Sequence, residues 1–279
     1  MTDLAPRAFV IGHPIAHSRS PLLHGHWLKA MGLAGSYEKI DVAPEVLKDF
    51  VAGMADAGFA GGNVTVPHKT AMLDLVDDLD DDARAIGAVN TLWFANGRLQ
   101  GSNTDVFGFL ASLDAEAPNW DVSAGKAFVI GAGGAARAIV HGLLQRGLDV
   151  HIANRSVGKA EDLSQAFARL PSVHGMDAVP ALLDNTDLVV NTTSLGMAGQ
   201  PPLNLSLERL KPSATVSDIV YVPLETDLLR EARQRGIRTV GGLGMLLHQA
   251  VPGFECWFGV RPTVTPELRA ALEANLAGR

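Results

Sequence analysis

The sequence has little of what marks secreted, membrane-bound or nucleic-acid-binding proteins. It contains one cysteine, Cys256, so an internal disulfide is excluded, and such a composition is typical of a reducing compartment. No apolar run approaches the roughly 18 residues that a membrane-spanning helix needs. Charged residues make up only 19% of the 279 residues and the net charge is −7, which argues against nucleic acid as a partner. The N-terminus, MTDLAPRAFV, lacks the pattern of a signal peptide, so we expect a cytoplasmic protein without a membrane partner.

Reactive thiols and metal ligands are also scarce. Cys256 lies in the aromatic stretch 254–258, and this setting predicts a buried structural thiol rather than a nucleophile. His24 and His26 are two residues apart on an expected helix and point in different directions, without a cysteine or acid nearby to complete a metal site. The acidic run 77–82 lacks the glycine and the final glutamate of a calcium loop, so helix caps and solvated faces explain it better. We therefore expect no metal.

Short apolar strands alternate with helical segments from residue 126 onward. Strands are expected at 127–130, 149–153, 173–175, 188–190, 214–220 and 237–240. Helices are expected between them, for example at 135–146 and 225–235. This succession predicts an α/β fold with a doubly wound parallel sheet.

The preceding part of the chain also mixes strands and helices. Strands are expected at 8–11, 36–42 and 63–66, and helices at 21–31, 44–57 and 106–116. Asn96-Gly97 predicts a hairpin that pairs 91–95 with 98–101. Two further helices are expected at 245–258 and 266–276. The length suffices for two domains with cores of their own.

The stretch 127–137, AFVIGAGGAAR, is the strongest single indication of a ligand. An apolar strand leads into a turn from Gly131 to Gly134, and a helix follows. In such a turn the backbone N–H groups point outward, and the missing Cβ atoms let a pyrophosphate approach the helix N-terminus. A tight strand-to-helix turn without a ligand is the alternative, but the position at the start of a βαβ unit favours a nucleotide.

The residues after the next strand predict which dinucleotide binds. An NAD site usually carries an acid about 20 residues after the glycines, to bind the ribose 2′-hydroxyl. This chain has Arg155 there, with Ser156 beside it and Lys159 one helical turn later. Cations at a helix N-terminus are unfavourable without a further role, and these groups would attract a 2′-phosphate. The sequence therefore predicts NADP(H).

Polar residues at element ends indicate a second site. In HSRSP, Ser20 is expected as the helix cap before Pro21. Ser18 and Ser20 are explained equally well by capping alone and by a carboxylate site at the helix N-terminus.

Lys69 follows a buried strand and a proline turn, a position where open α/β sheets bind ligands, although surface lysines are common. Asp105 is explained either as a helix cap or as part of a site. Lys69, Asn90 and Asp105 all lie at element ends, so a common cleft is the prediction that links them.

Several motifs in one order resemble the shikimate dehydrogenase family, from about Val10 to the end of the helix that contains Cys256. The motifs are GHPIAHSRSP, GGNVTVPHK, GAVNT, NTD at 103–105, GAGGAAR, NRS, NTTSLGM, DIVYVPLET and GGLGMLLHQA. The resemblance implies an N-terminal α/β substrate domain completed by C-terminal helices, with an inserted Rossmann-type NADP-binding domain. The implied boundaries are 1–107 with 243–279 for the first and 108–242 for the second. The implied reaction is the reversible, NADPH-dependent reduction of 3-dehydroshikimate to shikimate, in aromatic amino acid and chorismate biosynthesis.

The resemblance also implies roles for individual residues. It makes Lys69 the proton-transfer residue and Asp105 its polar partner. It assigns substrate binding to Ser18, Ser20, Thr65, Asn90, Asp105, Tyr221 and Gln249. It assigns cofactor binding to Asp81, Gly131, Ala132, Gly133, Gly134, Ala135, Asn154, Arg155, Ser156, Lys159, Ile219 and Gly242.

Small departures and two alternatives accompany this interpretation. Ser156 and Lys159 stand where many members have Thr and Arg, so the site lacks one bidentate cation. One alternative is a dehydrogenase for quinate or another ring hydroxy acid; such relatives tend to change the second serine or carry an acid near position 155. The other is a non-catalytic NADP-binding sensor, which would be expected to lose Lys69 or Asp105. The expected partners are small molecules, with the chain as a monomer or homodimer.

Overall fold

The computed structural model describes residues 5–278, which form two compact units. The first unit consists of the chain up to Thr104 and from Gln249 onward, and the second is Asp105–His248. The boundaries implied by the family resemblance are after residue 107 and before residue 243. Each unit has its own six-stranded sheet.

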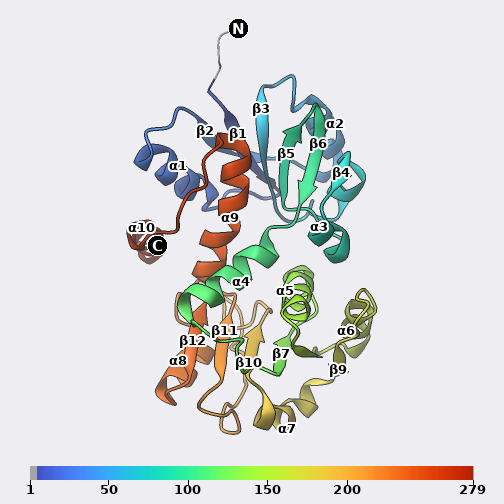
Figure 1. Ribbon diagram of the computed structural model, residues 1–279, viewed down its shortest axis with the longest axis vertical. Coiled ribbons are helices and arrows are strands. Elements are labelled where there is room, and N and C mark those ends of the chain that lie inside the picture. Colours follow the sequence, from blue (N-terminus) through green and yellow to red (C-terminus); the bar gives the residue numbers. More distant parts are fainter. Residues whose placement is uncertain (1–4, 279) are drawn as a thin grey trace. The chain divides into compact units, whose positions relative to one another are not determined.

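The sheet of the second unit is entirely parallel, with the order β12-β11-β10-β7-β8-β9 (Figure 1). Its strands are β7 Lys126–Ile130, β8 Asp149–Ala153, β9 Ser172–His174, β10 Leu188–Asn191, β11 Thr215–Asp218 and β12 Arg238–Gly241. All six were expected, so the doubly wound sheet is confirmed. The chain order reverses at β7, between β8 and β10, and ligands of such sheets bind at this switch point.

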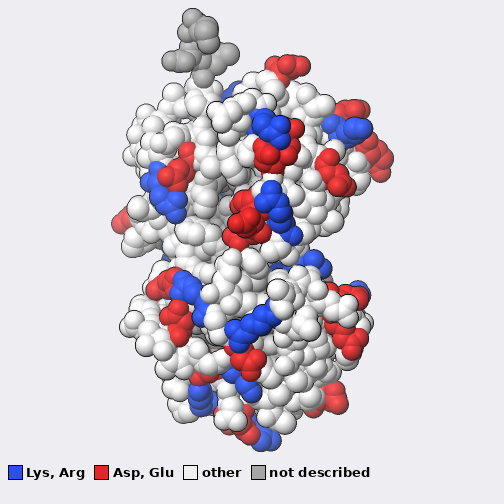
Figure 2. Space-filling model, turned by 45° about the vertical axis from the view of Figure 1, so that its right-hand side comes forward, with Lys and Arg blue, Asp and Glu red and all other residues white. Residues whose placement is uncertain are grey.

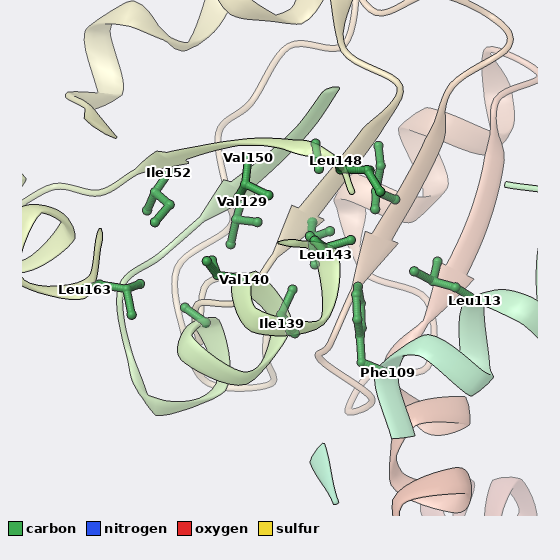
Figure 3. Close-up of a cluster of buried hydrophobic side chains, with 14 of the residues drawn as sticks. Phe109, Leu113, Val129, Ile139, Val140, Leu143, Leu148, Val150, Ile152 and Leu163 are labelled. Atoms are coloured by element: carbon green, nitrogen blue, oxygen red, sulfur yellow. The ribbon is translucent and has the colours of Figure 1, made fainter. Parts of the chain in front are cut away.

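Apolar residues on both faces of these strands explain the parallel sheet. Val129 packs in one cluster with Phe109 and Ile139 (Figure 3). Its neighbours Phe128 and Ile130 pack in another cluster. A strand covered on both sides is apolar throughout. The helices on the first face are α4 Asp105–Glu116, α5 Gly134–Gln145 and α6 Val157–Ser164. Those on the second face are α7 Val179–Leu182 and α8 Asp227–Gln234.

The sheet of the first unit is mixed, with the order β2-β1-β3-β5-β6-β4. Its strands are β1 Arg7–Gly12, β2 Ser36–Asp41, β3 Phe59–Val64, β4 Asp78–Leu79, β5 Thr91–Ala95 and β6 Arg98–Ser102. The antiparallel β5–β6 hairpin is confirmed, and β3 joins it to the parallel strands β1 and β2.

Strand β3 begins four residues earlier than expected. The expected strand 63–66 left Gly61 and Gly62 outside, but they pair with β1 inside the sheet. A Cβ atom at Gly61 would lie 2.1 Å from the Leu92 carbonyl oxygen, and one at Gly62 would lie 2.3 Å from the Phe9 ring. These glycines therefore permit close packing in the strand rather than a reversal of the chain.

Helices cover both faces of the first sheet. The elements are α1 Ser20–Ala30, α2 Leu47–Gly53, α3 Asp81–Ile86, α9 Gly242–Phe258, which passes from the second unit into the first, and α10 Pro266–Ala277. Short 3₁₀ turns occur at Pro44–Val46 and Ala71–Asp74, and in the second unit at Met176–Ala178 and Leu183–Asn185. Phe9 and Ile11 pack with α2 and α3 on one face. On the other, the Trp27 and Phe254 rings lie 5.3 Å apart, and Trp257 Nε1 donates to Leu92 O over 2.7 Å.

The prediction of a buried thiol at Cys256 is wrong, because this side chain is exposed. Phe254 and Trp257 turn inward from α9, and Cys256, between them in sequence, falls on the opposite side of the helix. Partial burial of the sulfur and the charge of Glu255 still raise the pKa of this thiol, so it remains a poor nucleophile.

Acidic and basic side chains are interspersed on the surface in view in Figure 2. The interpretation of the acidic run is confirmed: Asp80 caps α3 by accepting from Ala83 N at 2.7 Å, and Asp78 pairs with Arg98. The hydrogen bond from Arg98 lowers the pKa of Asp78 to about 2. Within residues 5–278, no helix combines the length and apolarity of a membrane span, and no group of three or more His, Cys, Asp or Glu side chains is placed to hold a metal ion.

Candidate functional site

The glycine turn between β7 and α5 contains one glycine that the fold requires and two that face open space. Gly131 has φ +115°, and a Cβ atom there would lie 2.5 Å from Thr192 Oγ1, so the fold itself requires glycine. A Cβ atom at Gly133 or Gly134 would meet nothing within 4 Å. The chain does not need glycine at these two positions, and the open space lies in front of the N-terminus of α5. This is the arrangement that a phosphate requires.

A pocket of ≈ 350 Å³ opens at this turn. Its walls come from the segments that follow three adjacent strands, β7, β8 and β10. The lining residues are Gly131, Ala132, Gly133, Asn154, Arg155, Ser156, Lys159, Thr192, Thr193 and Ser194. The structure thus brings seven of the twelve predicted cofactor residues into one pocket, at the switch point of the sheet.

The charge of this pocket is positive and uncompensated. Arg155 and Lys159 are both exposed, and neither forms an ion pair with any residue of the range 5–278. Ser156 occupies the cap position of α6, but its hydroxyl makes no capping bond. Asn154 Nδ2 donates to Ser156 O at 2.9 Å and fixes the turn that carries them. Two cations and a hydroxyl are therefore available to bind an anion.

The pocket residues Thr192, Thr193 and Ser194 were not predicted. Their motif, NTTSLGM, is one of those that carry the family resemblance, but the resemblance implied no role for these three residues. The signal that could have found them is their place after β10, the strand beside β7 at the switch point.

Buried polar side chains hold this loop. Asn191 Oδ1 accepts from the N–H and the hydroxyl of Thr193, and Asn191 Nδ2 donates to Asp218 Oδ1 at 3.0 Å. Asp218 is completely buried and also accepts from Val220 N and Thr226 Oγ1. Burial raises the pKa of Asp218, although these three hydrogen bonds oppose the effect.

The other five predicted cofactor residues do not line the pocket. Gly134 and Ala135 begin α5 beside it. Ile219 and Gly242 meet after β11 and β12, where a Cβ atom at Gly242 would lie 2.1 Å from Ile219 O. Asp81 lies in the first unit, exposed and paired with Arg84.

The predicted carboxylate site lies between β1 and α1 in the first unit. The expectation that Ser20 caps α1 is wrong, because Ser20 is the first helical residue and Arg19 occupies the cap position without a side-chain bond. Instead, Ser20 N donates to Ser18 Oγ at 3.3 Å. Pro21 still stands in the first turn, so the shift is one residue. The Ser18 hydroxyl thus lies directly at the helix N-terminus, where an anion is favoured.

Asn90 joins three segments at the carboxyl end of β3. Its side chain is buried, and Oδ1 accepts from Thr91 Oγ1, Thr104 N and Thr104 Oγ1 at 2.9, 2.8 and 3.2 Å. Asn63 Nδ2 donates to Asn90 O at 3.2 Å. These bonds fix Thr104, the residue before Asp105 and helix α4.

The main chain of Lys69 is fixed from two sides. Val89 N donates to Lys69 O at 2.8 Å, and the buried ring of the preceding residue, His68, donates from Nε2 to Val42 O at 2.7 Å. Thr65 N donates to Ile11 O at 2.9 Å. Thr65 and Lys69 are both half-buried just after β3.

The remaining predicted substrate residues are divided between the units. Gln249 belongs to the first unit, in α9, whereas Asp105 and Tyr221 belong to the second. All three side chains are half-buried. Tyr221 follows β11.

Three family models match the chain. The shikimate dehydrogenase substrate binding domain matches residues 10–92, shikimate / quinate 5-dehydrogenase matches 114–198, and the shikimate 5′-dehydrogenase C-terminal domain matches 242–272. The NADP(+) shikimate dehydrogenase of Methylobacterium radiotolerans is 57% identical, with 100% of both chains aligned. The chain belongs to the shikimate dehydrogenase family. The resemblance predicted from the sequence is therefore confirmed.

Solved structures support the same fold. The shikimate 5-dehydrogenase of Thermus thermophilus in complex with NADP(H) and shikimate has a TM-score of 0.84 and 36% identity, covering 98% of this chain and 99% of that one. A quinate dehydrogenase of Corynebacterium glutamicum in complex with NAD has a TM-score of 0.89 and 31% identity, covering 97% and 99%. The predicted α/β fold class is confirmed.

The buried carboxyl of Asp218 predicts a pH-dependent stability. Its folded-state pKa lies above the ordinary 3.8, so its protonated form favours the folded state. This contribution is complete below pH 3.8 and is lost as the pH rises through the folded-state pKa. We expect the free energy of unfolding of Asp218→Asn, relative to the unmodified protein, to rise as the pH increases from 3.8 toward neutrality. Urea unfolding at a series of pH values measures this difference.

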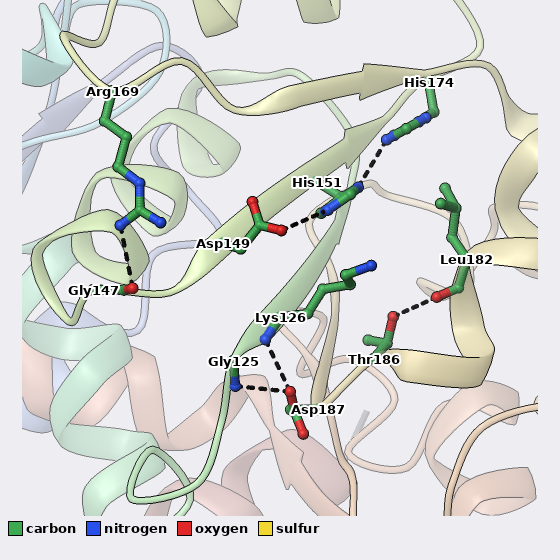
Figure 4. Close-up of polar contacts among 10 residues, drawn as sticks. All are labelled: Gly125, Lys126, Gly147, Asp149, His151, Arg169, His174, Leu182, Thr186 and Asp187. Carbon is green, nitrogen blue, oxygen red and sulfur yellow. Dashed lines mark hydrogen bonds and ion pairs between the residues drawn. The ribbon is translucent and has the colours of Figure 1, made fainter.

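Asp187→Asn serves as a control of opposite sign. Burial alone would raise the pKa of Asp187, but the pairing with Lys211 and the N–H groups of Lys126 and Gly125 outweigh it and lower the pKa. Figure 4 shows the hydrogen bonds that Gly125 N and Lys126 N donate to this carboxylate. Asp187 therefore stabilises the fold fully above pH 3.8, and this stabilisation is lost as the pH falls through its folded-state pKa. The relative stability of this variant should decrease as the pH rises toward 3.8 and stay level above it. Parallel profiles for both variants would contradict the assignment.

Proposed function

We propose that this chain is an NADP(H)-dependent oxidoreductase that interconverts 3-dehydroshikimate and shikimate, in the biosynthesis of chorismate and aromatic amino acids. The observation that supports NADP(H) as the cofactor is the pocket with Arg155 and Lys159. Neither of these two cations has a carboxylate partner among residues 5–278. Relatives named shikimate dehydrogenase (NADP(+)) support the reaction. The predictions of an oxidoreductase and of NADP(H) agree with these names.

The residues of the second unit fit this cofactor. The open positions Gly133 and Gly134 leave room for a pyrophosphate at the N-terminus of α5. Arg155, Ser156 and Lys159 would bind the 2′-phosphate. Ala132, Ala135, Asn154, Ile219, Gly242 and, from the first unit, Asp81 complete the proposed cofactor residues. The second unit is then the cofactor domain and the first the substrate domain.

Reduction of a ketone to an alcohol requires one proton in addition to a hydride. When bound, NADPH supplies the hydride that reduces the ketone of 3-dehydroshikimate. Lys69 gives a proton to the ketone oxygen as it becomes the hydroxyl of shikimate, and takes that proton back in the reverse direction. Asp105 is the proposed polar partner of Lys69, and an ammonium group at this oxygen would also stabilise its developing negative charge.

The other side chains bind and orient the substrate. Ser18 and Ser20 would hold its carboxylate at the N-terminus of α1. Thr65, Asn90, Tyr221 and Gln249 would bind its carboxyl or ring hydroxyl groups. Small molecules are the only partners that we propose, for a cytoplasmic monomer or homodimer without a nucleic-acid role.

A quinate dehydrogenase is the second candidate, because a relative of that name is solved with NAD. Arg155 argues against it, since an NAD site prefers an acid at this position. Rates with quinate and shikimate, each with NAD⁺ and NADP⁺, separate the two. Equal or greater turnover of quinate would overturn the proposed substrate.

Replacement of Lys69 tests the proton transfer. Lys69→Met keeps the apolar stem and removes the charge, so kcat for shikimate should fall by roughly 10²–10⁴ while KM changes little. Lys48→Met removes an exposed lysine of α2 and should leave kcat unchanged. A folded Lys69→Met protein with normal turnover would refute the role of this lysine.

Replacement of Arg155 tests the cofactor. A charge-assisted hydrogen bond contributes about 1.5–3 kcal/mol, so Arg155→Asp should reduce the preference of kcat/KM for NADP⁺ over NAD⁺ by roughly ten- to a hundredfold. Arg169→Asp makes the same change of charge outside the pocket and should preserve the preference. If the unmodified protein uses both cofactors equally well, the proposed 2′-phosphate site is wrong.

Two alanine substitutions in the glycine turn separate binding from folding. Gly134→Ala meets no atom and lies in a helix, so stability should be equal or up to about 1 kcal/mol higher, while affinity for NADP⁺ falls at least about tenfold. Gly131→Ala should lower the melting temperature, because its Cβ atom would clash with Thr192. Thermal melts and calorimetric titration with NADP⁺ measure both effects. Undiminished NADP⁺ binding by Gly134→Ala would contradict the pyrophosphate site.

A further inference from the structure

Two side chains of strand β2 hold the loop that carries Ser18. This loop, residues 13–19, connects β1 to α1. Lys39 Nζ donates to Ala16 O at 2.9 Å. The carboxylate of Asp41 accepts from His13 Nδ1 at 2.5 Å through one oxygen and from Ile15 N at 3.3 Å through the other. Lys39 and Asp41 are two residues apart on the strand, so they project from the same face toward the loop.

The contact with Asp41 continues to both serines through hydrogen bonds. Ile15 O accepts from Ser18 N at 3.0 Å, and Ser18 Oγ accepts from Ser20 N at 3.3 Å. Ile15 is therefore bonded through its N–H to Asp41 and through its carbonyl to Ser18. A displacement of residue 15 would therefore shift the Ser18 hydroxyl at the N-terminus of α1.

His13 N also donates to Val66 O at 3.1 Å, which ties the start of the loop to the segment after β3. Side-chain packing adds little to the order of the loop, because His13, Pro14, Ala16 and His17 are exposed and only the side chain of Ile15 is buried. The hydrogen bond from His13 lowers the pKa of Asp41, which keeps this carboxyl ionised at neutral pH. The Asp41 and His13 side chains are each about half exposed, and exposed ion pairs add little to global stability. The contacts are thus better suited to ordering the loop than to stabilising the fold.

We propose that Asp41 and Lys39 are positioning residues for substrate binding, which hold loop 13–19 so that Ser18 and Ser20 meet the substrate carboxylate. This inference rests on the proposed function, because that function assigns the carboxylate to the two serines. A loop ordered in advance spares the substrate the entropy cost of ordering it. Loss of either contact should therefore weaken shikimate binding without slowing the chemical step.

Steady-state kinetics of Asp41→Ala and Lys39→Met with shikimate and NADP⁺ test the proposal. For each variant we expect KM for shikimate to rise by about 3- to 10-fold, with kcat and KM for NADP⁺ within about twofold of the unmodified protein. Asp41→Asn keeps an acceptor for Ile15 N but loses the negative charge of the carboxylate, so its KM for shikimate should lie between that of the unmodified protein and that of Asp41→Ala. Unchanged KM for shikimate in Asp41→Ala and Lys39→Met would overturn the inference.

Glu38→Gln is the matched control. Glu38 lies on the same strand, is similarly exposed and pairs with Arg7 at 2.9 Å, but it projects from the other face and does not touch the loop. KM for shikimate should not change in this variant. If KM for shikimate rises equally in Glu38→Gln and Asp41→Ala, the cause is a general disturbance of β2 and the positioning role is refuted.

Amide hydrogen exchange gives a readout that does not depend on activity. The N–H groups of Ser18 and Ser20 are both hydrogen-bonded in the loop, so their exchange should accelerate in Asp41→Ala and stay unchanged in Glu38→Gln. Unchanged exchange in Asp41→Ala overturns the inference whatever the activity. If exchange accelerates but the unmodified protein does not turn over shikimate, the proposed function fails and the ordering of the loop by Asp41 stands.

Discussion

Hydrogen bonds to buried polar side chains at strand ends hold the loops of both candidate sites. In the first unit, Asn90 receives three hydrogen bonds on one oxygen and so fixes the start of the segment that leads to Asp105. In the second, Asp218 and Asn191 fix the loops after β10 and β11. Loops at the surface lack a core of their own, and buried partners supply the order that binding requires. An unsatisfied buried donor or acceptor costs free energy, so each network strongly favours one loop conformation.

Steric contacts then distinguish the glycines that the fold needs from those that a ligand needs. Gly131, Gly61 and Gly62 each face protein atoms that a Cβ atom would strike. Gly133 and Gly134 face nothing within 4 Å, so protein packing does not require glycine there and the open space leaves room for a ligand. The sequence presents all five alike, and only the structure separates them.

Elements with a local sequence pattern were predicted correctly. The predictions were wrong where the conformation of a segment depends on residues far away in the chain. The strands of the second sheet are apolar on both faces, and this pattern is visible in any short window. The start of β3 was missed because Gly61 and Gly62 are typical of turns, while their strand conformation depends on β1 and on Leu92. Cys256 was misplaced because its aromatic neighbours indicate a core, whereas the direction of a helix face depends on tertiary packing. The cap of α1 was off by one residue, which local patterns cannot resolve.

The candidate site, like the fold, was predicted from the sequence only where the signal is local. The glycine turn and Arg155 carry their chemistry in sequence, and the structure places them in one pocket. Thr192 and Ser194 entered this pocket only through the pairing of β10 with β7, over 60 residues of separation in the chain, since Val190 pairs with Val129. Asp41 likewise looks like the solvent-facing end of an alternating strand, and its contact with Ile15 spans 26 residues.

The distribution of charge explains how a chain of net charge −7 can bind two anionic ligands. Acidic side chains are placed next to the structural arginines: Asp78 beside Arg98, and Asp114 beside Arg146. These pairs cancel one another within a few ångströms, so they add little to the potential at the pocket. Arg155 and Lys159 have no such neighbour within the described chain, and their field remains for a ligand. The sign of the local potential therefore depends on which cations are left without an acid, and the net charge of the chain does not determine it.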